Sequence, residues 1–385
     1  MSRTLLALII FFALTIAFPA QLQAVTFPTQ TIKLFETTQW SLTNSTYSGN
    51  PFDLNATATF RHNTGKEIRT QMYYVGNNIW TFRFTGSQTG SWTFSTSSND
   101  PELNTSTGTI IVDNQTNPAI RGFLTHQGNK YVLPDHTGQN QAYLQNVFMD
   151  IHSFGEFLDG FESNPKTKSR EYCQAAKNNG MNTYFLLITN YWFKWGAKTH
   201  TEHSSSDPDL KTFTVLEQII EEAHLNGCRI NLWAWGDSER NWSPKVINGE
   251  ADKRIQRYIA ARLGPLPGWS IGYGFDLHEW VTDAQLDQWA DYLNQHLGWP
   301  ILLSARSHKY NKPNTIQGYS IEDQELGGNY QLTPLPSYNQ IVFDLDSDTS
   351  RPHLYEERHT YQRWNLDFQD TRRLMWRTAI AGGMG

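Results

Sequence analysis

The segment from residue 25 to about residue 118 alternates polar and apolar positions in short runs. Residues 54–60 and 79–84 are two such runs, rich in β-branched and aromatic side chains and bounded by turn-forming residues. A period of two with regularly spaced turns predicts antiparallel strands that bury one face. No helical pattern interrupts these runs, so residues 25–118 are expected to form an antiparallel β-sandwich.

After about residue 140 the pattern changes to apolar strands that alternate with amphipathic helices. Residues 183–188 are a fully apolar run, a helical pattern follows at 213–226, and the next apolar strand covers 228–235. Strands that are buried on both faces and separated by helices indicate a parallel sheet. About seven such units fit a (β/α)8 barrel better than an open doubly wound sheet.

The barrel is assigned to residues 119–385, which makes the chain a multidomain protein. Its later strands are expected at 316–319 or 340–343 and at 353–355. The sequence reaches Gly385 where an eighth strand would begin or end, so the barrel is expected to be incomplete at its C-terminal end.

Residues 1–24 are expected to be a secretory signal peptide. A short positive start precedes an almost unbroken apolar run over residues 5–18, and small residues follow around Ala24. We therefore expect a secreted, periplasmic or cell-surface protein with no membrane segment after cleavage. Cys173 and Cys228 could pair in such an oxidising compartment, but both lie in apolar periodic segments, so two buried free thiols are expected.

Composition narrows the classes of partner. The 31 Lys and Arg against 37 Asp and Glu give a net charge of −6, which argues against nucleic acid binding through a basic surface. The 14 Trp, 17 Tyr and 21 Phe make the aromatic content unusually high. No glycine-rich phosphate-binding motif opens a helix and no G-x-S-x-G motif occurs, so we expect neither a cofactor nor a serine nucleophile.

The predicted strand ends carry acids, aromatic residues, arginine and histidine together. In a barrel of this kind the reactive side chains follow the C-terminal ends of the strands. Aromatic rings stack on the C–H faces of a sugar, and carboxylates and arginine bond its hydroxyls, so this mixture suits a carbohydrate substrate. The predicted substrate-binding residues are Trp192, Trp233, Trp235, Asp237, Tyr273, Arg306, His308, Tyr355 and Arg358.

Glu279 and Glu356 are the predicted catalytic pair. They follow predicted strands four and seven, which lie across the barrel mouth from each other. Hydrolysis of a glycosidic bond needs one protonated carboxyl for the leaving group and a second that attacks the anomeric carbon or activates water. Asp276 is the alternative acid and Glu357 the alternative to Glu356. A separation of about 5 Å predicts retention of configuration, and roughly 6.5–9.5 Å predicts inversion.

Several segments resemble those of secreted apiosidase-like glycoside hydrolases. In the predicted barrel they are residues 272–280, 297–300, 351–358 and 373–385, and in the predicted sandwich they are residues 76–80 and 90–92. The resemblance implies a (β/α)8 barrel behind an Ig-like sandwich, and a nucleophile on strand seven.

The resemblance carries the nucleophile over to Glu356 or Glu357. Arg358 would share the face of Glu356 and favour its ionised form, so Glu356 is preferred. In the wider superfamily of retaining barrels an Asn precedes the strand-four acid, whereas His278 stands there in this chain. Some members of the resembled type use Asp at strand four, which keeps Asp276 open.

These features predict a retaining glycoside hydrolase that acts on a plant or microbial polysaccharide or oligosaccharide. One alternative is a non-catalytic carbohydrate-binding surface protein on a barrel scaffold. Another is a metal-dependent lyase or esterase. Asp150, His152 and Asp237 could hold a metal, but no close ligand pair such as H-E-x-x-H supports a metal site, and none is expected.

Overall fold

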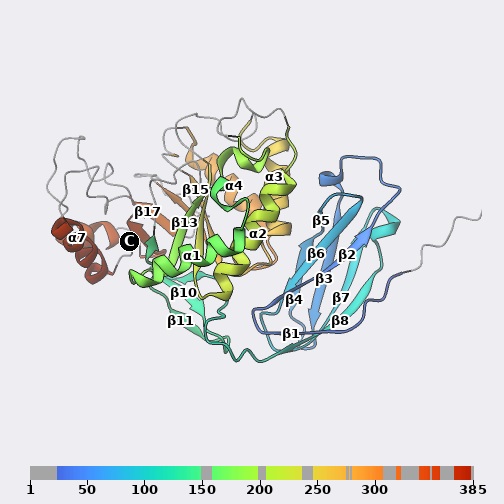
Figure 1. Cartoon of the computed structure of the whole chain (residues 1–385), viewed down its shortest axis with the longest axis horizontal. Helices are drawn as coiled ribbons and strands as arrows, with labels where there is room; N and C mark the ends of the chain where they lie inside the picture. The colour runs from blue at the N-terminus through green and yellow to red at the C-terminus, as the bar shows by residue number, and fades with distance from the viewer. Residues whose placement is uncertain are drawn as a thin grey trace, which may run out of the picture.

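The computed structural model of the chain has a β-sheet part followed by an α/β part (Figure 1). It describes residues 24–148, 158–197, 205–235, 246–274, 277, 280–306, 318–321, 338–346, 349–355 and 368–382. The predicted signal peptide lies outside this range except for Ala24. None of the helices in the described ranges is long and apolar enough to cross a lipid bilayer.

The first part consists of two sheets, which we call the N-terminal sandwich. One sheet has five strands in the order β1-β8-β7-β3-β4, and the other has three in the order β2-β6-β5. The strands are β1 Gln30–Lys33, β2 Thr37–Thr43, β3 Ala56–His62, β4 Glu67–Gln71, β5 Tyr73–Tyr74, β6 Ile79–Thr85, β7 Gly90–Ser98 and β8 Thr107–Asp113. Two short 3-10 helices, η1 Pro51–Asp53 and η2 Pro101–Leu103, lie in the connections.

The sandwich is not wholly antiparallel as predicted, because β1 pairs with β8 in parallel. After β1 the chain crosses to the other sheet through Phe35, whose φ is +64°, and enters β2 instead of forming a hairpin. Aromatic side chains from both sheets share one core. The ring centroids of Trp40 and Phe94 are 4.6 Å apart, as are those of Phe60 and Phe84.

A small antiparallel sheet follows the sandwich and was not predicted. Its strands are β9 Thr125–Gln127, β10 Lys130–Pro134 and β11 Asn140–Ala142. Tyr131, Leu133 and Tyr143 form a buried cluster with Leu302, which comes just before a strand of the next sheet. In Figure 1 this small sheet lies below the α/β part.

The α/β part, which we call the parallel-sheet unit, is built on seven parallel strands in sequence order. They are β12 Val147–Phe148, β13 Thr183–Leu187, β14 Arg229–Trp235, β15 Trp269–Gly274, β16 Leu303–Arg306, β17 Gly318–Ile321 and β18 His353–Tyr355. The helices are α1 Pro165–Asn178, α2 Leu210–Leu225, α3 Glu250–Arg262, α4 Asp283–His296, α5 Tyr338–Asp346 and α7 Phe368–Ala381, with the 3-10 helices η4 Asp159–Phe161 and η5 Thr189–Trp192. In the part of the chain that the structure describes, the sheet ends at β12 and β18 without closing into a barrel.

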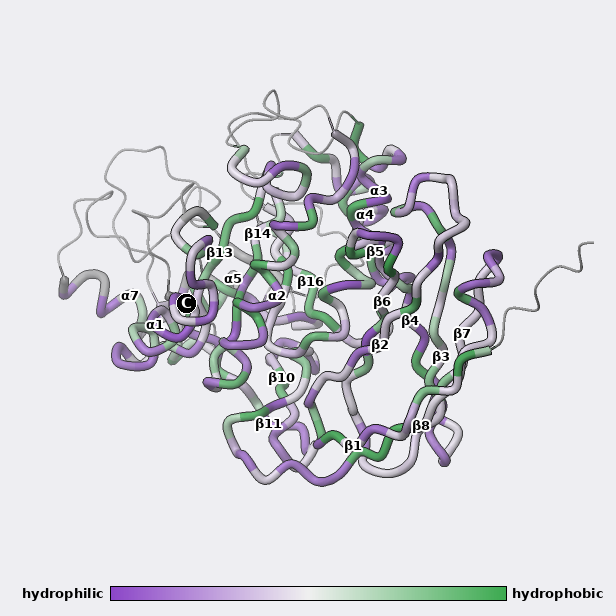
Figure 2. Tube along the Cα trace, turned by 45° about the vertical axis from the view of Figure 1, so that its right-hand side comes forward, coloured by the Kyte–Doolittle hydropathy of each residue, from purple (hydrophilic) through white to green (hydrophobic). Residues whose placement is uncertain are grey.

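Hydrophobic pattern and helix ends explain these elements. All seven residues of β14 are buried, as expected for a strand covered on both faces, and Figure 2 shows hydrophobic colour along β13 and β14. The side chain of Asp209 accepts a hydrogen bond from the backbone N–H of Thr212 and caps α2. A reciprocal capping box of Thr282 and Gln285 starts α4.

Two further predictions from the sequence are wrong. Residues 340–343 belong to helix α5, not to a strand, while the alternative strand is present as β17. Cys173 and Cys228 form a disulfide and are not free thiols. The chain leaves α2 and turns back beside α1, which brings the two Cα atoms to 5.8 Å, within the range that a disulfide spans.

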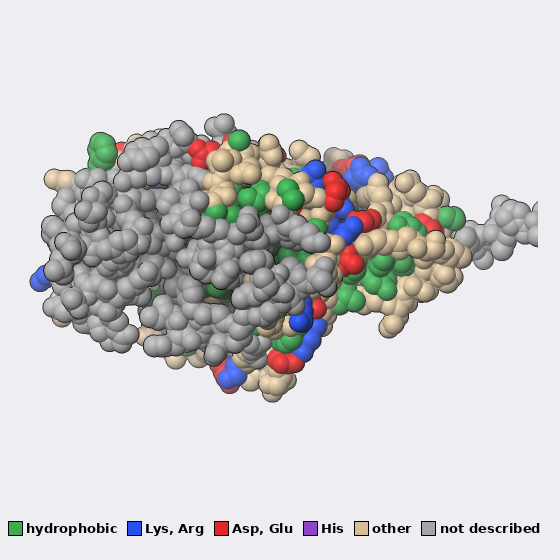
Figure 3. Space-filling model, turned by 90° about the horizontal axis from the view of Figure 1, so that it is seen from above, with side chains coloured by type: hydrophobic (Ala, Val, Ile, Leu, Met, Phe, Trp, Pro, Cys, Tyr) green, Lys and Arg blue, Asp and Glu red, His purple; other side chains and the backbone are tan. Residues whose placement is uncertain are grey.

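The sandwich and the parallel-sheet unit meet across a buried polar contact. Arg83 on β6 and Arg262 on α3 both pair with Glu217 on α2, at 2.7 Å and 2.5 Å. The Tyr258 hydroxyl donates to the backbone oxygen of Tyr74 at 2.5 Å. Figure 3 shows Lys, Arg, Asp and Glu side chains gathered where the two parts adjoin. These contacts fix the sandwich against the helices that cover the sheet.

Candidate functional site

The carboxyl ends of the seven parallel strands lie along one edge of the sheet, which we call the C-terminal edge. Side chains that follow these strands are therefore brought together, however far apart they are in the sequence. The last strand residues at this edge are Phe148, Leu187, Trp235, Gly274, Arg306, Ile321 and Tyr355.

The four candidate catalytic acids, Asp276, Glu279, Glu356 and Glu357, lie outside the described residues. The strands before them are described. β15, the fourth strand of the sheet, ends at Gly274, and β18, the seventh, ends at Tyr355 directly before Glu356 in the sequence. The predicted order of these strands is thus confirmed, and the distance between the acids stays a prediction.

Three of the predicted substrate-binding residues, Asp237, His308 and Arg358, also lie outside the described residues. Arg306 and Tyr355 are described only as strand residues. Arg306 pairs with Ser320 and Tyr355 with Ile321, so both backbones end at the C-terminal edge.

Trp233 belongs to a small buried cluster with Phe185, apart from the main core that contains the buried side chains of α2, α3 and α4. Its ring packs edge-to-face on Phe185, with centroids 4.5 Å apart and an angle of 80° between the planes, and only 1% of the residue is exposed. Gly272 on the adjacent strand makes room for this ring, because a Cβ there would lie 2.9 Å from Cδ1 of Trp233. The position of the indole therefore depends on a glycine in the neighbouring strand.

Trp235 does not share this environment, although its spacing from Trp233 predicts the same face of the strand. Its ring packs against Trp192 and against Trp289 of α4, with centroids 6.3 Å and 6.0 Å apart. The indole N–H of Trp192 donates to the backbone oxygen of Ala234 at 2.9 Å. These contacts belong to the layer between strands and helices.

Tyr273 packs on the helix side as well. Its ring stacks on Trp289 with centroids 5.7 Å apart and 14° between the planes. Burial, together with the nearby carboxylates Asp252 and Asp291, raises the pKa of Tyr273 well above its usual range, so the phenol stays protonated. That Trp192, Trp233, Trp235 and Tyr273 contact substrate remains a prediction, and their described contacts are with protein.

Backbone conformation is unusual at the C-terminal edge. Thr189, two residues after β13, has a φ of +49°, which is rare for a β-branched residue. Gly274 at the end of β15 has a φ of +141°, and a Cβ there would lie 2.4 Å from the backbone oxygen of Trp235. Residues held in such conformations cluster at functional sites, which supports a functional role for this edge.

Asn190 is a further candidate that the sequence analysis did not select. It follows Thr189 in η5, is fully buried, and its backbone oxygen accepts hydrogen bonds from Phe193 and Lys194. A polar pair directly after a fully apolar strand was the available signal, because a buried amide is costly unless it is hydrogen-bonded. In the described ranges no group of three or more His, Cys, Asp or Glu could hold a metal ion.

Comparison with known protein families gives one match. A model described as a domain of unknown function, DUF5060, matches residues 31–99, within the N-terminal sandwich. No curated protein matches the sequence of this chain.

Solved structures give clearer matches. The chain is similar to a protein of Bacteroides vulgatus ATCC 8482 that is provisionally assigned as a glycoside hydrolase, with a TM-score of 0.61 and 17% identity over 85% of this chain and 64% of that one. It is also similar to a glycoside hydrolase at 13% identity and to a family 5 glycoside hydrolase of Bacteroides vulgatus ATCC 8482 at 12%. Both of these have a TM-score of 0.50 and cover 69% of this chain and 64% and 62% of theirs.

The chain thus spans a little under two thirds of the length of these three structures. At such low identity the likeness shows a shared fold.

Proposed function

We propose that this protein is a secreted retaining glycoside hydrolase that acts on a plant or microbial polysaccharide or oligosaccharide. The observation that carries the proposal is the order of the parallel sheet. Its fourth and seventh strands end on one edge, and Glu279 and Glu356 follow those strands in the sequence. The shared fold with three structures described as glycoside hydrolases supports the same class.

In the proposed fold the seven described strands belong to a (β/α)8 barrel preceded by an Ig-like sandwich. Sequential parallel strands with a helix in most connections are what such a barrel requires. The disulfide between Cys173 and Cys228 supports an oxidising, extracytoplasmic location, because such bonds are rare in reducing compartments.

The proposed mechanism uses two steps. Glu356 attacks the anomeric carbon while Glu279, or Asp276 in its place, gives its proton to the departing glycosidic oxygen. The same acid, now a carboxylate, then removes a proton from water, which displaces Glu356 and releases the sugar with its original configuration. Arg358 favours the ionised form of Glu356.

The predicted substrate-binding residues divide by their surroundings. Trp233 is the aromatic candidate that we assign to sugar contact, because it lies with Phe185 in a small cluster apart from the main core that contains the buried helix side chains. Trp192, Trp235 and Tyr273 pack among themselves and against Trp289 of α4. Their proposed role is to position the strand ends that form the wall of the site. Asp237, Arg306, His308 and Tyr355 complete the proposed hydrogen-bonding set.

The test is hydrolysis of a panel of aryl glycosides and of plant and microbial glycans by the whole chain. Glu356→Ala should abolish turnover of any substrate found. Azide should restore turnover of aryl glycosides in Glu279→Ala, because azide attacks the glycosyl-enzyme without needing a general base in place of the missing Glu279. Glu357→Gln and the exposed Glu171→Gln are matched controls that should retain activity. Full activity of both Glu356→Ala and Glu357→Ala would reject the assignment of the nucleophile to either residue. A chain that binds glycans without turning any over would point to the carbohydrate-binding alternative.

A further inference from the structure

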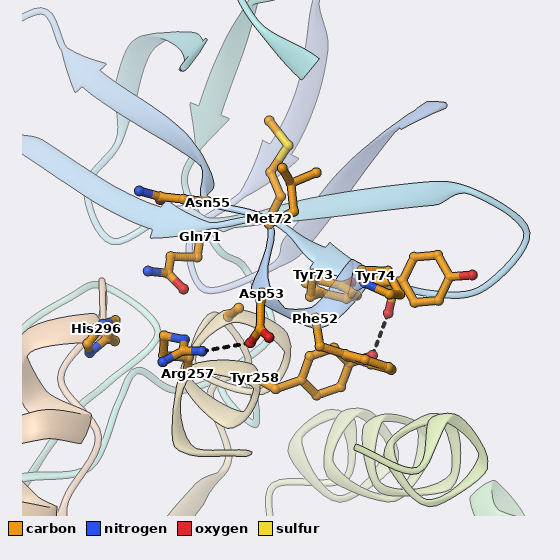
Figure 4. Close-up of a pocket in the computed structure, with 13 residues that line it drawn as sticks. Phe52, Asp53, Asn55, Gln71, Met72, Tyr73, Tyr74, Arg257, Tyr258 and His296 are labelled. Carbon is orange, nitrogen blue, oxygen red and sulfur yellow. Dashed lines mark hydrogen bonds and ion pairs between the residues drawn. The ribbon is translucent and has the colours of Figure 1, made fainter. Parts of the chain in front are cut away.

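A cleft of about 280 Å³ lies where the N-terminal sandwich meets helices α3 and α4 (Figure 4). The sandwich contributes the region of η1, the end of β4, and β5. The helices contribute Arg257, Tyr258, Ala261 and His296. None of the predicted catalytic or substrate-binding residues lines this cleft, so the proposed hydrolase function leaves it unexplained.

Ion pairs fix the floor of the cleft and balance its charge. Asp53 pairs with Arg254 at 2.5 Å and with Arg257 at 3.1 Å, and Arg254 also pairs with Asp207 at 3.0 Å. The hydrogen bond from Arg254 holds the pKa of Asp53 below its usual value, so the carboxylate is ionised. Of these four residues Asp53 and Arg257 line the cleft, and their charges offset each other, which leaves no net charge to attract an ion.

His296 offers a hydrogen-bond acceptor to the cleft. Its Nδ1 lies 2.7 Å from the backbone oxygen of Tyr292, which can only accept, so Nδ1 carries the proton. Burial lowers the pKa of His296 below its usual value, so the ring is neutral at pH 7 and Nε2 is an acceptor. On the same helix the Tyr292 hydroxyl receives a hydrogen bond from Arg257 at 2.8 Å.

Two side-chain amides supply further donors and acceptors. Gln71 and Asn55 line the cleft, and neither side chain forms a hydrogen bond within the described residues. Figure 4 shows the Gln71 amide directed toward the side formed by His296 and Arg257. Each amide presents one oxygen acceptor and two N–H donors.

The remaining wall is aromatic and rigid. The Phe52 ring packs edge-to-face on Tyr74 and on Tyr258, with centroids 5.5 Å and 5.3 Å apart. The hydrogen bond from Tyr258 to the backbone of Tyr74 joins the two sides of the cleft. The cleft is therefore built into the contact between the two parts of the chain, and the ring contacts of Phe52 hold the connection that contains η1 against α3.

We propose that this cleft is a second carbohydrate-binding site that takes one neutral monosaccharide unit. Sugar hydroxyls both donate and accept, which matches the amides, the neutral histidine and the paired carboxylate. The charge balance disfavours an acidic sugar or another anion. The volume is near the lower end of the roughly 300–1,000 Å³ of ligand sites, so it suits one ring and not a long chain. This inference goes beyond the proposed hydrolase, because the site holds sugar without cleaving it.

The test measures binding of the methyl glycosides of glucose, galactose, mannose, xylose and arabinose to the whole chain by saturation-transfer NMR and calorimetry. At least one should bind, and Gln71→Ala and His296→Ala should each raise its Kd about tenfold or more, as expected for one lost hydrogen bond. The matched control is Gln295→Ala, an exposed glutamine on α4 beside His296 that does not line the cleft. Because Gln71 is half-buried, Asn55→Ala, at an exposed position, provides a second variant that should weaken binding without affecting folding.

Binding that is unchanged in Gln71→Ala, His296→Ala and Asn55→Ala would overturn the proposal, as would the absence of binding by every methyl glycoside. Tighter binding of glucuronate than of methyl glucoside would overturn the assignment to a neutral sugar. Because this test measures binding and not hydrolysis, a failure of the cleft proposal can be distinguished from a failure of the proposed hydrolase function. Cleft binding by a chain that hydrolyses no substrate would contradict only the hydrolase proposal. Hydrolysis by a chain whose cleft binds no sugar would contradict only the cleft proposal.

Discussion

Arg83 on β6 and Glu217 on α2 form an ion pair, with 2.7 Å between Nη1 and Oε1, although they lie in different parts of the chain. Their side chains are only 7% and 11% exposed. Nη1 of Arg83 also donates to the backbone oxygen of Arg262 at 2.9 Å. Burial alone would raise the pKa of Glu217, but Arg83 and Arg262 more than offset it and keep that pKa below its usual value. The contact between the two parts thus depends on a charge that is buried and paired.

Replacing Arg83 should destabilise the whole chain. Arg83→Met leaves Glu217 paired with Arg262 alone and removes the hydrogen bond to the backbone oxygen of Arg262, and leaving buried polar groups without a partner costs about 1–3 kcal/mol. Arg83→Met should therefore lower the free energy of unfolding by roughly that amount, as measured by denaturant titration followed by tryptophan fluorescence.

The matched control is Arg61→Met, which breaks the exposed pair of Arg61 and Glu67 within the sandwich. Exposed pairs contribute about 0–1 kcal/mol, so this change should be small. Equal effects of the two substitutions would contradict the structural role of the buried pair.

His224 should make the protein sensitive to acid. Its Nε2 lies 3.2 Å from the backbone oxygen of Phe35, and burial lowers the pKa of the imidazole to about 3. The unfolded chain binds this proton near the ordinary pKa of about 6.5, so stability is fully present above that pH and falls by up to about 1.4 kcal/mol per pH unit as the pH drops toward 3. His224→Gln can keep the hydrogen bond without titrating, so its stability should depend less on pH between 6.5 and 3. Identical pH profiles of the two proteins by thermal unfolding would contradict this.

The order of the parallel sheet could be predicted because its strands are apolar on both faces and helices separate most of them. β14 is buried along its whole length, and the buried face of α2 includes the predicted Leu216 and Ile220. The predicted strand at 340–343 fails because a short apolar run fits a helix equally well. In α5, Ile341 is buried and Phe343 is 69% exposed, which the local sequence did not distinguish.

The site could be predicted only in part. The sequence places Glu279 and Glu356 after strands that are the fourth and seventh of the sheet. It did not separate Trp233 from Trp235, because a period of two puts both on one face, and the contacts of Trp235 with Trp192 and Trp289 are tertiary. The pairing of Cys173 with Cys228 depends on how α1 lies beside α2. The cleft between the two parts brings Gln71 near His296, a juxtaposition that no local pattern contains.

Gly272 should be required for the position of the Trp233 ring. A Cβ at residue 272 would lie 2.9 Å from Cδ1 and 3.0 Å from Nε1 of that indole, so Gly272→Ala should cost about 1–3 kcal/mol through overpacking. Gly160→Ala is the matched control, because no heavy atom lies within 4 Å of a Cβ there. Adding Trp233→Phe should recover part of the loss. A stability of Gly272→Ala equal to that of wild type, together with an unchanged near-ultraviolet circular dichroism spectrum, would show that the ring does not depend on this glycine.

The disulfide should stabilise the parallel-sheet unit by restricting the unfolded chain. Cys173 and Cys228 are separated by 55 residues, and closing a loop of that length is worth about 4 kcal/mol in the chain-entropy treatment. Reductant should therefore lower the free energy of unfolding of the wild-type protein by roughly this amount. The Cys173→Ala/Cys228→Ala double variant should already be less stable and should not respond to reductant, which separates the bond from other effects of the reagent. If reductant destabilised both proteins equally, the bond would not be the source of the stability.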